Sequence, residues 1–165
     1  MRAVDIETAL KRKYPEGVVL VVTTDGKKVN FAPVSWITNA SRRSRSWVLS
    51  LYKGHRTTKN IEKNKEFVVC FPSEKQKKDV SYCGTVSGND VDKLKKCKFT
   101  LTTAKNVKAP LIKDSVACFE CKLLKEVVVP KSNHVIIIGE IVAAYVSKEK
   151  KRLFHWGNYK LNVIK

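Results

Sequence analysis

Short apolar runs rich in Val, Ile and Thr recur along this 165-residue chain, separated by polar turns and without an internal repeat. Runs of four to eight β-branched and aromatic residues bounded by turn residues are typical of strands. The runs cover residues 18–24, 28–36, 47–52, 67–71, 115–124, 126–129 and 134–146. So many strands with few helical segments predict a mainly β protein, a closed or nearly closed antiparallel β-barrel with short helices.

Three turn or breaker signals position these strands. Asp25-Gly26 is a strong hairpin signal between the first two runs. Pro33 has no backbone N–H, so we expect it at a sheet edge or a bulge. Gly139 interrupts the longest run, where we expect the strand to bend at a bulge or barrel corner.

The helical segments are short and lie between strands. Residues 4–14 carry apolar positions at helical spacing and end in basic residues before Pro15, which predicts a short leading helix. We also expect helices at 57–64, with a threonine cap, and at 89–98, opened by Asn and Asp. Residues 73–87 are polar and mixed, with room for a helical turn, and the aromatic-rich tail 153–164 is a final strand or an arm.

Length and composition exclude several classes of protein. At about 100 to 200 residues per domain we expect one domain, residues 1–165, which can bury a core without staples. With 43% apolar residues the chain is too hydrophobic for disorder. Its longest apolar stretch, 135–146, is interrupted by Gly139 and Glu140, and the charged N-terminus lacks the apolar core of a secretion signal. We therefore expect a soluble, cytoplasmic protein without a membrane partner.

Five cysteines are an odd number for a chain without an export signal, which argues against a complete disulfide framework. Cys118 and Cys121 form a CxxC, but the sequence around them alternates as a strand. Positions three apart on a strand point to opposite faces and cannot share a metal ion. We expect buried core thiols, keep a metal or redox pair as the alternative, and assign no metal ligands.

The net charge of +18 is typical of a nucleic-acid binder, so its distribution matters. Successive thirds of the chain carry +6, +7 and +5, without a basic tail or arm. Lys accounts for 26 of the 33 basic residues, although Arg is the residue favoured for reading phosphates and bases. The charge therefore predicts a basic surface but no specific nucleic acid. Two local clusters, Arg42, Arg43 and Arg45 and residues 148–152, have the charge to hold an anion.

Two segments of the first half carry candidate binding chemistry, although no HExxH, GxSxG, P-loop or GxGxxG motif occurs. In residues 30–41 a strand passes through a proline into Ser35 and Thr38, whose hydroxyls are free to donate hydrogen bonds. The alternative there is an ordinary strand with Trp36 in the core. In residues 53–60 a cationic side chain, a Thr hydroxyl and the N–H groups of a starting helix make either an anion site or a capped surface helix.

A third segment lies in the second half. His134 opens the apolar run that ends at residue 146. A single histidine at such a position is either a catalytic group or a satisfied structural one, and both interpretations stay open.

Five segments, taken in order, resemble the flavin reductase-like family, the FMN-binding split barrels that include NADH:FMN oxidoreductases and flavoredoxins. They read GVVLVVTT with DGKKVNFAPVSWIT, HRTTKNIEKNKEF with VVCF, VSGNDVDKL, VACFECKL and NHVIIIGEI. The likeness spans almost the whole chain. It implies a Greek-key antiparallel split barrel, a homodimer, and FMN bound near the dimer interface.

The resemblance also implies roles for the residues that match the family's flavin-binding segments. Those that would meet the ring or ribityl chain of FMN are Ser35, Trp36, Ile37, Thr38, Ser50 and Tyr52. Those that would hold the phosphate are Arg56, Thr57 and Asn60, with His55 nearby.

Further matches lie beyond the first half. Lys93 and His134 correspond to positions close to the flavin, and His134 is the candidate catalytic residue that orients the nicotinamide or the isoalloxazine. His155, Trp156 and Tyr159 resemble the family's closing segment, which can contribute to the site of the partner subunit.

One departure from the family follows the SWIT segment. Family members usually continue with an acidic residue and paired prolines, whereas this chain reads NASRRSRSWVLSLY. We expect the resulting loop of Arg42, Arg43 and Arg45 to lie beside the cofactor and to face the second substrate or another anion.

The implied function is an FMN-dependent oxidoreductase that takes a hydride from NADH or NADPH and passes electrons to a free flavin, a ferric complex or a protein. A flavoredoxin-type electron carrier without NAD(P)H activity is the alternative within the fold. Alternatives of other classes are a non-enzymatic ligand-binding protein and a single-strand nucleic-acid-binding barrel that stacks bases on Trp36, Trp47 and Tyr52.

Overall fold

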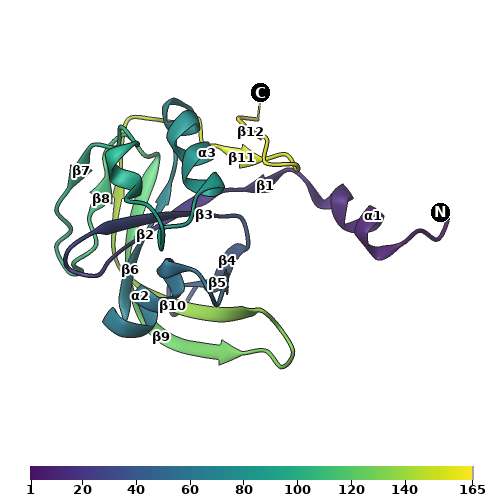
Figure 1. Cartoon of the computed structure of the whole chain (residues 1–165), viewed down its shortest axis with the longest axis horizontal. Coiled ribbons are helices and arrows are strands. Elements are labelled where there is room, and N and C mark those ends of the chain that lie inside the picture. The colour runs from purple at the N-terminus through teal and green to yellow at the C-terminus, as the bar shows by residue number, and fades with distance from the viewer. Residues whose placement is uncertain (165) are drawn as a thin grey trace.

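The computed structural model describes residues 1–164, and its main element is a seven-stranded sheet (Figure 1). The strands follow one another in the order β3, β2, β6, β9, β10, β5 and β4. Their bounds in that order are Val29–Val34, Val19–Thr24, Glu66–Phe71, Ala117–Val128, His134–Val146, Ser46–Tyr52 and Ile37–Ser41. Every pair is antiparallel, which confirms the predicted mainly β, antiparallel fold.

Two small sheets complete the β-structure. One contains β1 (Glu16–Gly17), β11 (Phe154–His155) and β12 (Leu161–Asn162), so the tail pairs with the start of the chain. The other joins β7 (Leu101–Thr102) to β8 (Leu111–Ile112). Two short strands therefore form where the tail was predicted to be a strand or an arm.

The hairpin of β2 and β3 forms as predicted. Its turn contains Gly26, whose φ of 91° suits glycine because it has no Cβ. Pro33 pairs with Leu20, and β3 is an edge of the large sheet. An edge strand is the position in a sheet where a residue without an N–H is tolerated.

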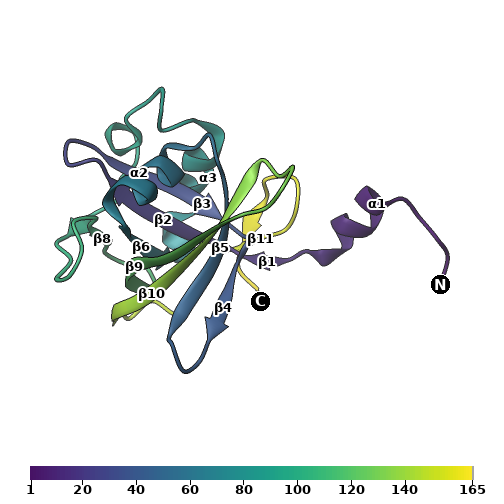
Figure 2. The ribbon, with the colours of Figure 1, turned by 90° about the horizontal axis from the view of Figure 1, so that it is seen from below.

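The long hairpin of β9 and β10 differs in part from the prediction. Residues 115–124 and 126–129 are not two strands, because β9 runs through Lys125 without a break. The register shifts between Ile138 and Gly139, which confirms the expected irregularity. A Cβ on Gly139 would collide with the ring of Phe67, so a side chain has no room there. Figure 2 shows this hairpin from another side.

The helices are α1 (Ile6–Leu10), α2 (Arg56–Asn64) and α3 (Lys77–Thr85). In Figures 1 and 2 α1 projects away from the sheet, whereas α2 and α3 lie against it. α3 packs on β3, and α2 packs on β2 and β3. The region 73–87 is thus more helical than its mixed sequence indicates.

Two helix predictions are wrong in detail. Residues 89–98 form turns with one short 3₁₀ segment, Lys93–Lys95, because Asp92 bonds the backbone N–H of Leu94 and favours a local turn. α2 has no threonine cap, since His55 is its N-cap and makes no side-chain capping bond.

The sheet separates two apolar cores. Along β2, Leu20 and Val22 enter one core while Val19 and Val21 enter the other, as strand alternation requires. Cys118 lies in the first core and Cys121 in the second, which confirms that the CxxC cysteines point to opposite faces. All five cysteines are buried. Among residues 1–164, no helix is long and apolar enough to cross a membrane.

Candidate functional site

Three cavities meet at Pro33 on the edge strand β3. We call them the cationic pocket (about 90 Å³), the aromatic pocket (about 370 Å³) and the tail pocket (about 190 Å³). The cationic and aromatic pockets also share His55, and the aromatic and tail pockets share Ser35, His155 and Tyr159. A single elongated ligand could therefore occupy more than one of them.

The cationic pocket lies at the start of α2. It is lined by Asn30, His55, Arg56, Thr57, Gly88 and Lys93 together with small neighbours. Helix N-termini carry unsatisfied N–H groups and partial positive charge, and here no side chain among residues 1–164 caps them. Two cationic side chains and an open helix end make this pocket suitable for an anion.

Arg56 is held in place by two contacts. Its guanidinium forms an ion pair with Asp25 in the β2–β3 turn, and its Nη1 donates to the carbonyl of Gly88 at 3.0 Å. The N–H groups of Lys28 and Lys27, and then Arg56, hold the pKa of the Asp25 carboxyl well below its ordinary value. The hairpin turn and the loop containing Gly88 thus fix the cation at the pocket.

Lys93 is the second cation and is almost fully buried. Its Nζ donates to the carbonyls of Phe31, at 2.8 Å, and Cys83, at 2.6 Å. Burial lowers the pKa of Lys93. An ammonium group in this position links the 3₁₀ segment Lys93–Lys95 to β3 and α3, and it has a third N–H available for a ligand.

Asn30 completes the floor of the cationic pocket. Its Nδ2 donates to Thr57 Oγ1 at 2.8 Å, while its buried Oδ1 has no partner among residues 1–164. Gly88 lies against that oxygen so closely that a Cβ would collide with it. A half turn of the amide would let Thr57 donate to Oδ1 and would direct the NH₂ group elsewhere, so this residue can adapt to a ligand.

The aromatic pocket contains all three histidines of the chain. The ring centroids of Trp36 and His134 are 5.0 Å apart, those of Tyr52 and His55 are 5.0 Å apart, and those of Tyr52 and His134 are 5.9 Å apart. Such distances are those of favourable aromatic pairs. The result is a wall of rings that can contact a planar ligand.

Two of these histidines have a lowered pKa, so their rings stay neutral over a wider pH range than a free histidine does. Burial, followed by the charges of Lys93 and His134, lowers the pKa of His55. Burial also lowers the pKa of His155. The Nδ1 of His134 lies 2.6 Å from Asn133 Oδ1, which orients its ring.

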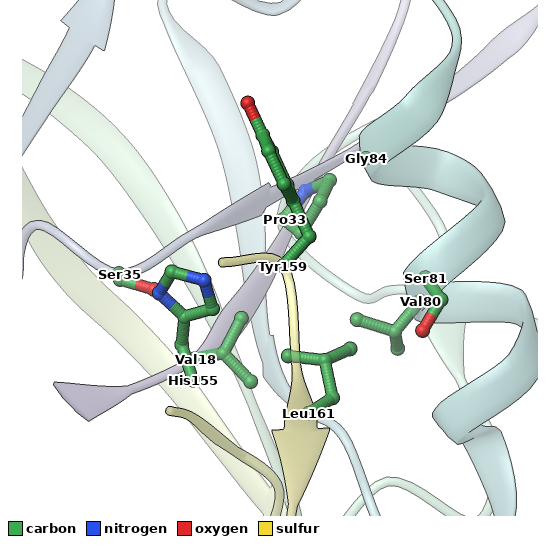
Figure 3. A pocket seen from close by; sticks show the side chains of 9 residues that line it. All are labelled: Val18, Pro33, Ser35, Val80, Ser81, Gly84, His155, Tyr159 and Leu161. Atoms are coloured by element: carbon green, nitrogen blue, oxygen red, sulfur yellow. The ribbon is translucent and has the colours of Figure 1, made fainter. Parts of the chain in front are cut away.

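The tail pocket is formed where the C-terminal segment approaches α3. Figure 3 shows His155, Tyr159 and Leu161 of the tail on one side, with Val80 and Ser81 of α3 on the other. Its walls are mostly apolar. Because the tail closes it, movement of the tail would connect this pocket more widely with the aromatic pocket.

Most of the residues predicted for the site gather in the aromatic pocket and the cationic pocket. Those lining the aromatic pocket are Ser35, Trp36, Ser50, Tyr52, His55, His134, His155 and Tyr159. Those lining the cationic pocket are His55, Arg56, Thr57 and Lys93. The interpretation of Trp36 as a core residue is wrong, because its side chain is 49% exposed.

Four predicted residues lie outside these pockets. The Nδ2 of Asn60 donates to Thr23 Oγ1 at 3.1 Å, so this buried amide joins α2 to β2. Ile37 packs in the core, Thr38 is exposed on β4, and Trp156 is exposed in the tail. In this chain alone none of the four lines the aromatic or the cationic pocket.

The arginine loop lies away from the aromatic pocket of its own chain. Arg42, Arg43 and Arg45 lie in the turn between β4 and β5, at the Ser46 end of β5. The aromatic pocket is at the Tyr52 end, and six strand steps of about 3.3 Å separate the two ends by about 20 Å. Two of the arginines line a different cavity of about 460 Å³ with Trp47.

Several site residues were not predicted from the sequence. Asp25, Asn30 and Gly88 hold the cationic pocket together, and Tyr14 and Glu16 line the aromatic pocket. Asp25 and Gly88 resemble ordinary turn residues in the sequence. Only the folded hairpin brings Asp25 to Arg56, and only the folded loop after α3 brings Gly88 there. The polar Asn30 in a β-branched run was the one available signal.

Comparisons with known proteins agree with this fold. The flavin reductase like domain matches residues 11–162. An uncharacterized protein of Archaeoglobus fulgidus is 31% identical over 138 residues, which are 84% of this chain and 76% of that protein. One of Pyrococcus abyssi is 31% identical over 137 residues, 83% of this chain and 77% of that protein.

Solved structures show the same architecture. Flavoredoxin from Methanosarcina acetivorans superposes with a TM-score of 0.81 and 25% identity, over 93% of this chain and 87% of that one. An FMN-binding protein from Thermus thermophilus gives a TM-score of 0.85 with 22% identity, over 99% and 94% of the two chains. The seven-stranded antiparallel sheet is thus a split barrel, and with the domain match over almost its full length the chain belongs to the flavin reductase-like family.

Proposed function

We propose that this protein binds FMN and acts as an NAD(P)H-dependent oxidoreductase that delivers electrons to a free flavin, a ferric complex or a protein. Family membership supports a flavin-related oxidoreductase. The observation that carries the finer proposal is the shared wall of the two pockets: His55 and Pro33 border both a small cationic pocket and a larger aromatic one. FMN has the matching shape, an anionic phosphate at one end and a planar ring system at the other.

The cationic pocket fits the phosphate end. Arg56 and Lys93 supply positive charge, Thr57 supplies a hydroxyl, and the uncapped first turn of α2 supplies N–H groups. The buried Oδ1 of Asn30 has no partner among residues 1–164, as expected of an amide that reorients when a ligand enters.

The aromatic pocket fits the ring end. Trp36, Tyr52 and His134 supply ring faces and edges, while Ser35 and Ser50 supply hydroxyls for polar ring atoms. A bound flavin would supply the redox chemistry, accepting two electrons from a reduced nicotinamide and passing them on. The residues of the chain bind and orient, since the reaction depends on holding two ring systems about 3 to 3.5 Å apart. His134, positioned by Asn133, is the residue we assign to this orientation.

We also propose that the working form is a homodimer. The aromatic pocket is bordered by large side chains that are well exposed in one chain: Trp36 at 49%, Tyr52 at 42% and Tyr159 at 85%. A second copy lying over this face would remove these apolar surfaces from water and would exclude water from the site. Size-exclusion chromatography with light scattering, at several concentrations, tests this directly.

Titration with FMN and with riboflavin tests the proposed binding. We expect FMN to bind with a Kd well below about 1 mM, and more tightly than riboflavin, which has the same ring but no phosphate. The difference between the two ligands measures the contribution of the cationic pocket. Absence of FMN binding at about 1 mM would reject the proposal.

Two alternatives make different predictions. An electron carrier without NAD(P)H activity would bind FMN but would not be reduced by either nicotinamide. A single-strand nucleic-acid binder would need a row of stacking aromatics, but Trp47 packs on Phe71 and Phe119, with centroids 5.8 and 5.5 Å away, and lines a different cavity from Trp36 and Tyr52. This arrangement favours the flavin proposal.

A further inference from the structure

Four of the five cysteines form two contacting pairs in the same apolar core. The Sγ atoms of Cys83 and Cys97 are 3.5 Å apart, and those of Cys70 and Cys118 are 2.7 Å apart. Cys121 lies in the other core, with its Sγ near only a backbone carbonyl. The CxxC therefore does not make a pair, but the fold creates two others from cysteines distant in sequence.

The Cys83 and Cys97 pair is part of the cationic pocket. Cys83 is in the last turns of α3 and lines the pocket, and Cys97 follows the 3₁₀ segment that contains Lys93. The chain between the two cysteines contains Ser87, Gly88 and Lys93, which form one wall of that pocket. A covalent link between the cysteines would therefore close the segment that carries this wall.

The two thiols differ in reactivity. The two sulfur atoms are in hydrogen-bond contact, and this contact lowers the pKa of Cys97 while it raises that of Cys83. Cys97 is also the more exposed of the two, at 8% against 1%. The thiolate is the reactive form of cysteine, so Cys97 is the nucleophile and Cys83 the residue that resolves the product.

We propose that Cys83 and Cys97 are a reversible redox site that hydrogen peroxide converts into a disulfide across the wall of the cationic pocket. The sulfur of Cys97 attacks one peroxide oxygen, the O–O bond breaks, and the product is a sulfenic acid and water. The sulfur of Cys83 then attacks the sulfenic sulfur, the S–S bond forms, the S–O bond breaks, and the leaving hydroxide takes the Cys83 proton as a second water. Two thiols lose two electrons and one peroxide becomes two waters.

The disulfide would fix the pocket wall with little movement. The sulfur atoms, now 3.5 Å apart, need to approach to about 2.05 Å. Lys93 already ties the carbonyl of Cys83 to the 3₁₀ segment through a 2.6 Å bond, so both ends of the linked segment are close. A cross-link that orders the wall before the ligand arrives reduces the entropy lost on binding. We expect tighter FMN binding, by about 2- to 10-fold.

The other cysteines supply internal comparisons. Cys70 and Cys118 are directly opposite on β6 and β9, and neither lines the cationic pocket. An oxidised Cys70 and Cys118 pair would therefore leave the pocket wall unlinked. Cys121 belongs to neither pair, it is fully buried, and burial raises its pKa. A Cys121→Ser variant therefore removes one thiol but leaves both pairs in place, which makes it the matched control.

Peptide mapping of the peroxide-treated protein tests the site. The full chain is treated with hydrogen peroxide, alkylated and digested, and linked peptides are identified by mass spectrometry with and without dithiothreitol. We expect a dithiothreitol-sensitive link between Cys83 and Cys97 in the wild type and in Cys121→Ser, and its loss in Cys97→Ser and in Cys83→Ser. A map with no such link, or with only the Cys70 and Cys118 link, would overturn the proposal.

The effect on ligand binding is measured separately and rests on the proposed function, whereas the peptide map does not. FMN is titrated into reduced and oxidised wild type and into Cys97→Ser after the same peroxide treatment. We expect the Kd for FMN to be about 2- to 10-fold lower in the oxidised wild type than in the reduced wild type. This difference should be absent from Cys97→Ser. An unchanged Kd in protein that carries the link would show that the disulfide does not act on the pocket.

Discussion

The side-chain amide of Asn30 on β3 donates to the hydroxyl of Thr57 in the first turn of α2, with an N···O distance of 2.8 Å. The bond is buried and joins residues 27 positions apart in the chain. It fixes the start of α2 against the sheet edge, where the cationic pocket opens. Gly88 closes the other side of the same amide, so three separate segments determine the position of one hydroxyl.

Gly88→Ala tests this packing. The new Cβ would collide with Asn30 Oδ1, so we expect a loss of about 1–3 kcal/mol in the free energy of unfolding, the usual cost of overpacking. Urea denaturation measures it. In the double variant Asn30→Ala/Gly88→Ala the colliding atom is gone, so the two effects should be non-additive. Additive effects would mean that Gly88 and Asn30 do not constrain each other.

Arg56→Ala tests the proposed phosphate site. Loss of a charge-assisted bond costs about 1.5–3 kcal/mol, so the Kd for FMN should rise about 10- to 150-fold. The Kd for riboflavin should stay unchanged, because it has no phosphate. Thr57→Ala added to this variant should weaken FMN further. Arg43→Ala, at the far end of β5, is the control and should bind both ligands as the wild type does. An equal loss for FMN and riboflavin would place the phosphate elsewhere.

Asp25→Asn tests the ion pair that holds Arg56. Because the folded-state pKa of Asp25 is lowered, its charge contributes stability above the ordinary pKa of 3.8, and this contribution is lost as pH falls below that value. The wild type should therefore be more stable than Asp25→Asn at neutral pH, and the difference should shrink as pH falls below about 4. Thermal unfolding from pH 7 to pH 3 measures both. A difference that is independent of pH would assign the stability to something other than the carboxylate charge.

His134→Ala tests the role of orientation. If His134 only orients the reacting rings, FMN should bind as before, while the rate of its reduction should fall about 10- to 100-fold. Asn133→Ala, which removes the oxygen 2.6 Å from His134 Nδ1, should show a smaller loss of the same kind. Stopped-flow reduction of FMN-loaded protein measures these rates. A wild-type rate in His134→Ala would make His134 a structural residue.

The main strands were predictable from the sequence because their physical signals are local. A continuous run rich in β-branched residues defines β2, and Asp25-Gly26 defines the turn that follows. The sheet-edge position of Pro33 follows from its missing N–H. In contrast, β4 has no signal of its own, since its exposed polar residues gain strand structure only by pairing with β5.

The parts of the site that escaped prediction depend on tertiary contacts. Nothing near Asp25 indicates that it meets Arg56, because the hairpin brings them together across 31 positions. β4 and β5 carry the arginine loop away from the aromatic pocket of its own chain, and sequence distance from Ser35 does not show this. Asn60 was assigned to the phosphate, but helical geometry directs it to Thr23. The cysteine pairs likewise join residues that only the fold makes neighbours.

Anaerobic mixing of the FMN-loaded protein with NADH, and separately with NADPH, tests the central claim most directly. The visible absorbance of oxidised flavin is followed by stopped flow, and dithionite is added at the end to show that the bound flavin can be reduced. The proposed function predicts rapid loss of this absorbance with at least one of the two nucleotides. Absorbance that persists with both nucleotides and disappears only with dithionite would contradict it and would identify an electron carrier instead.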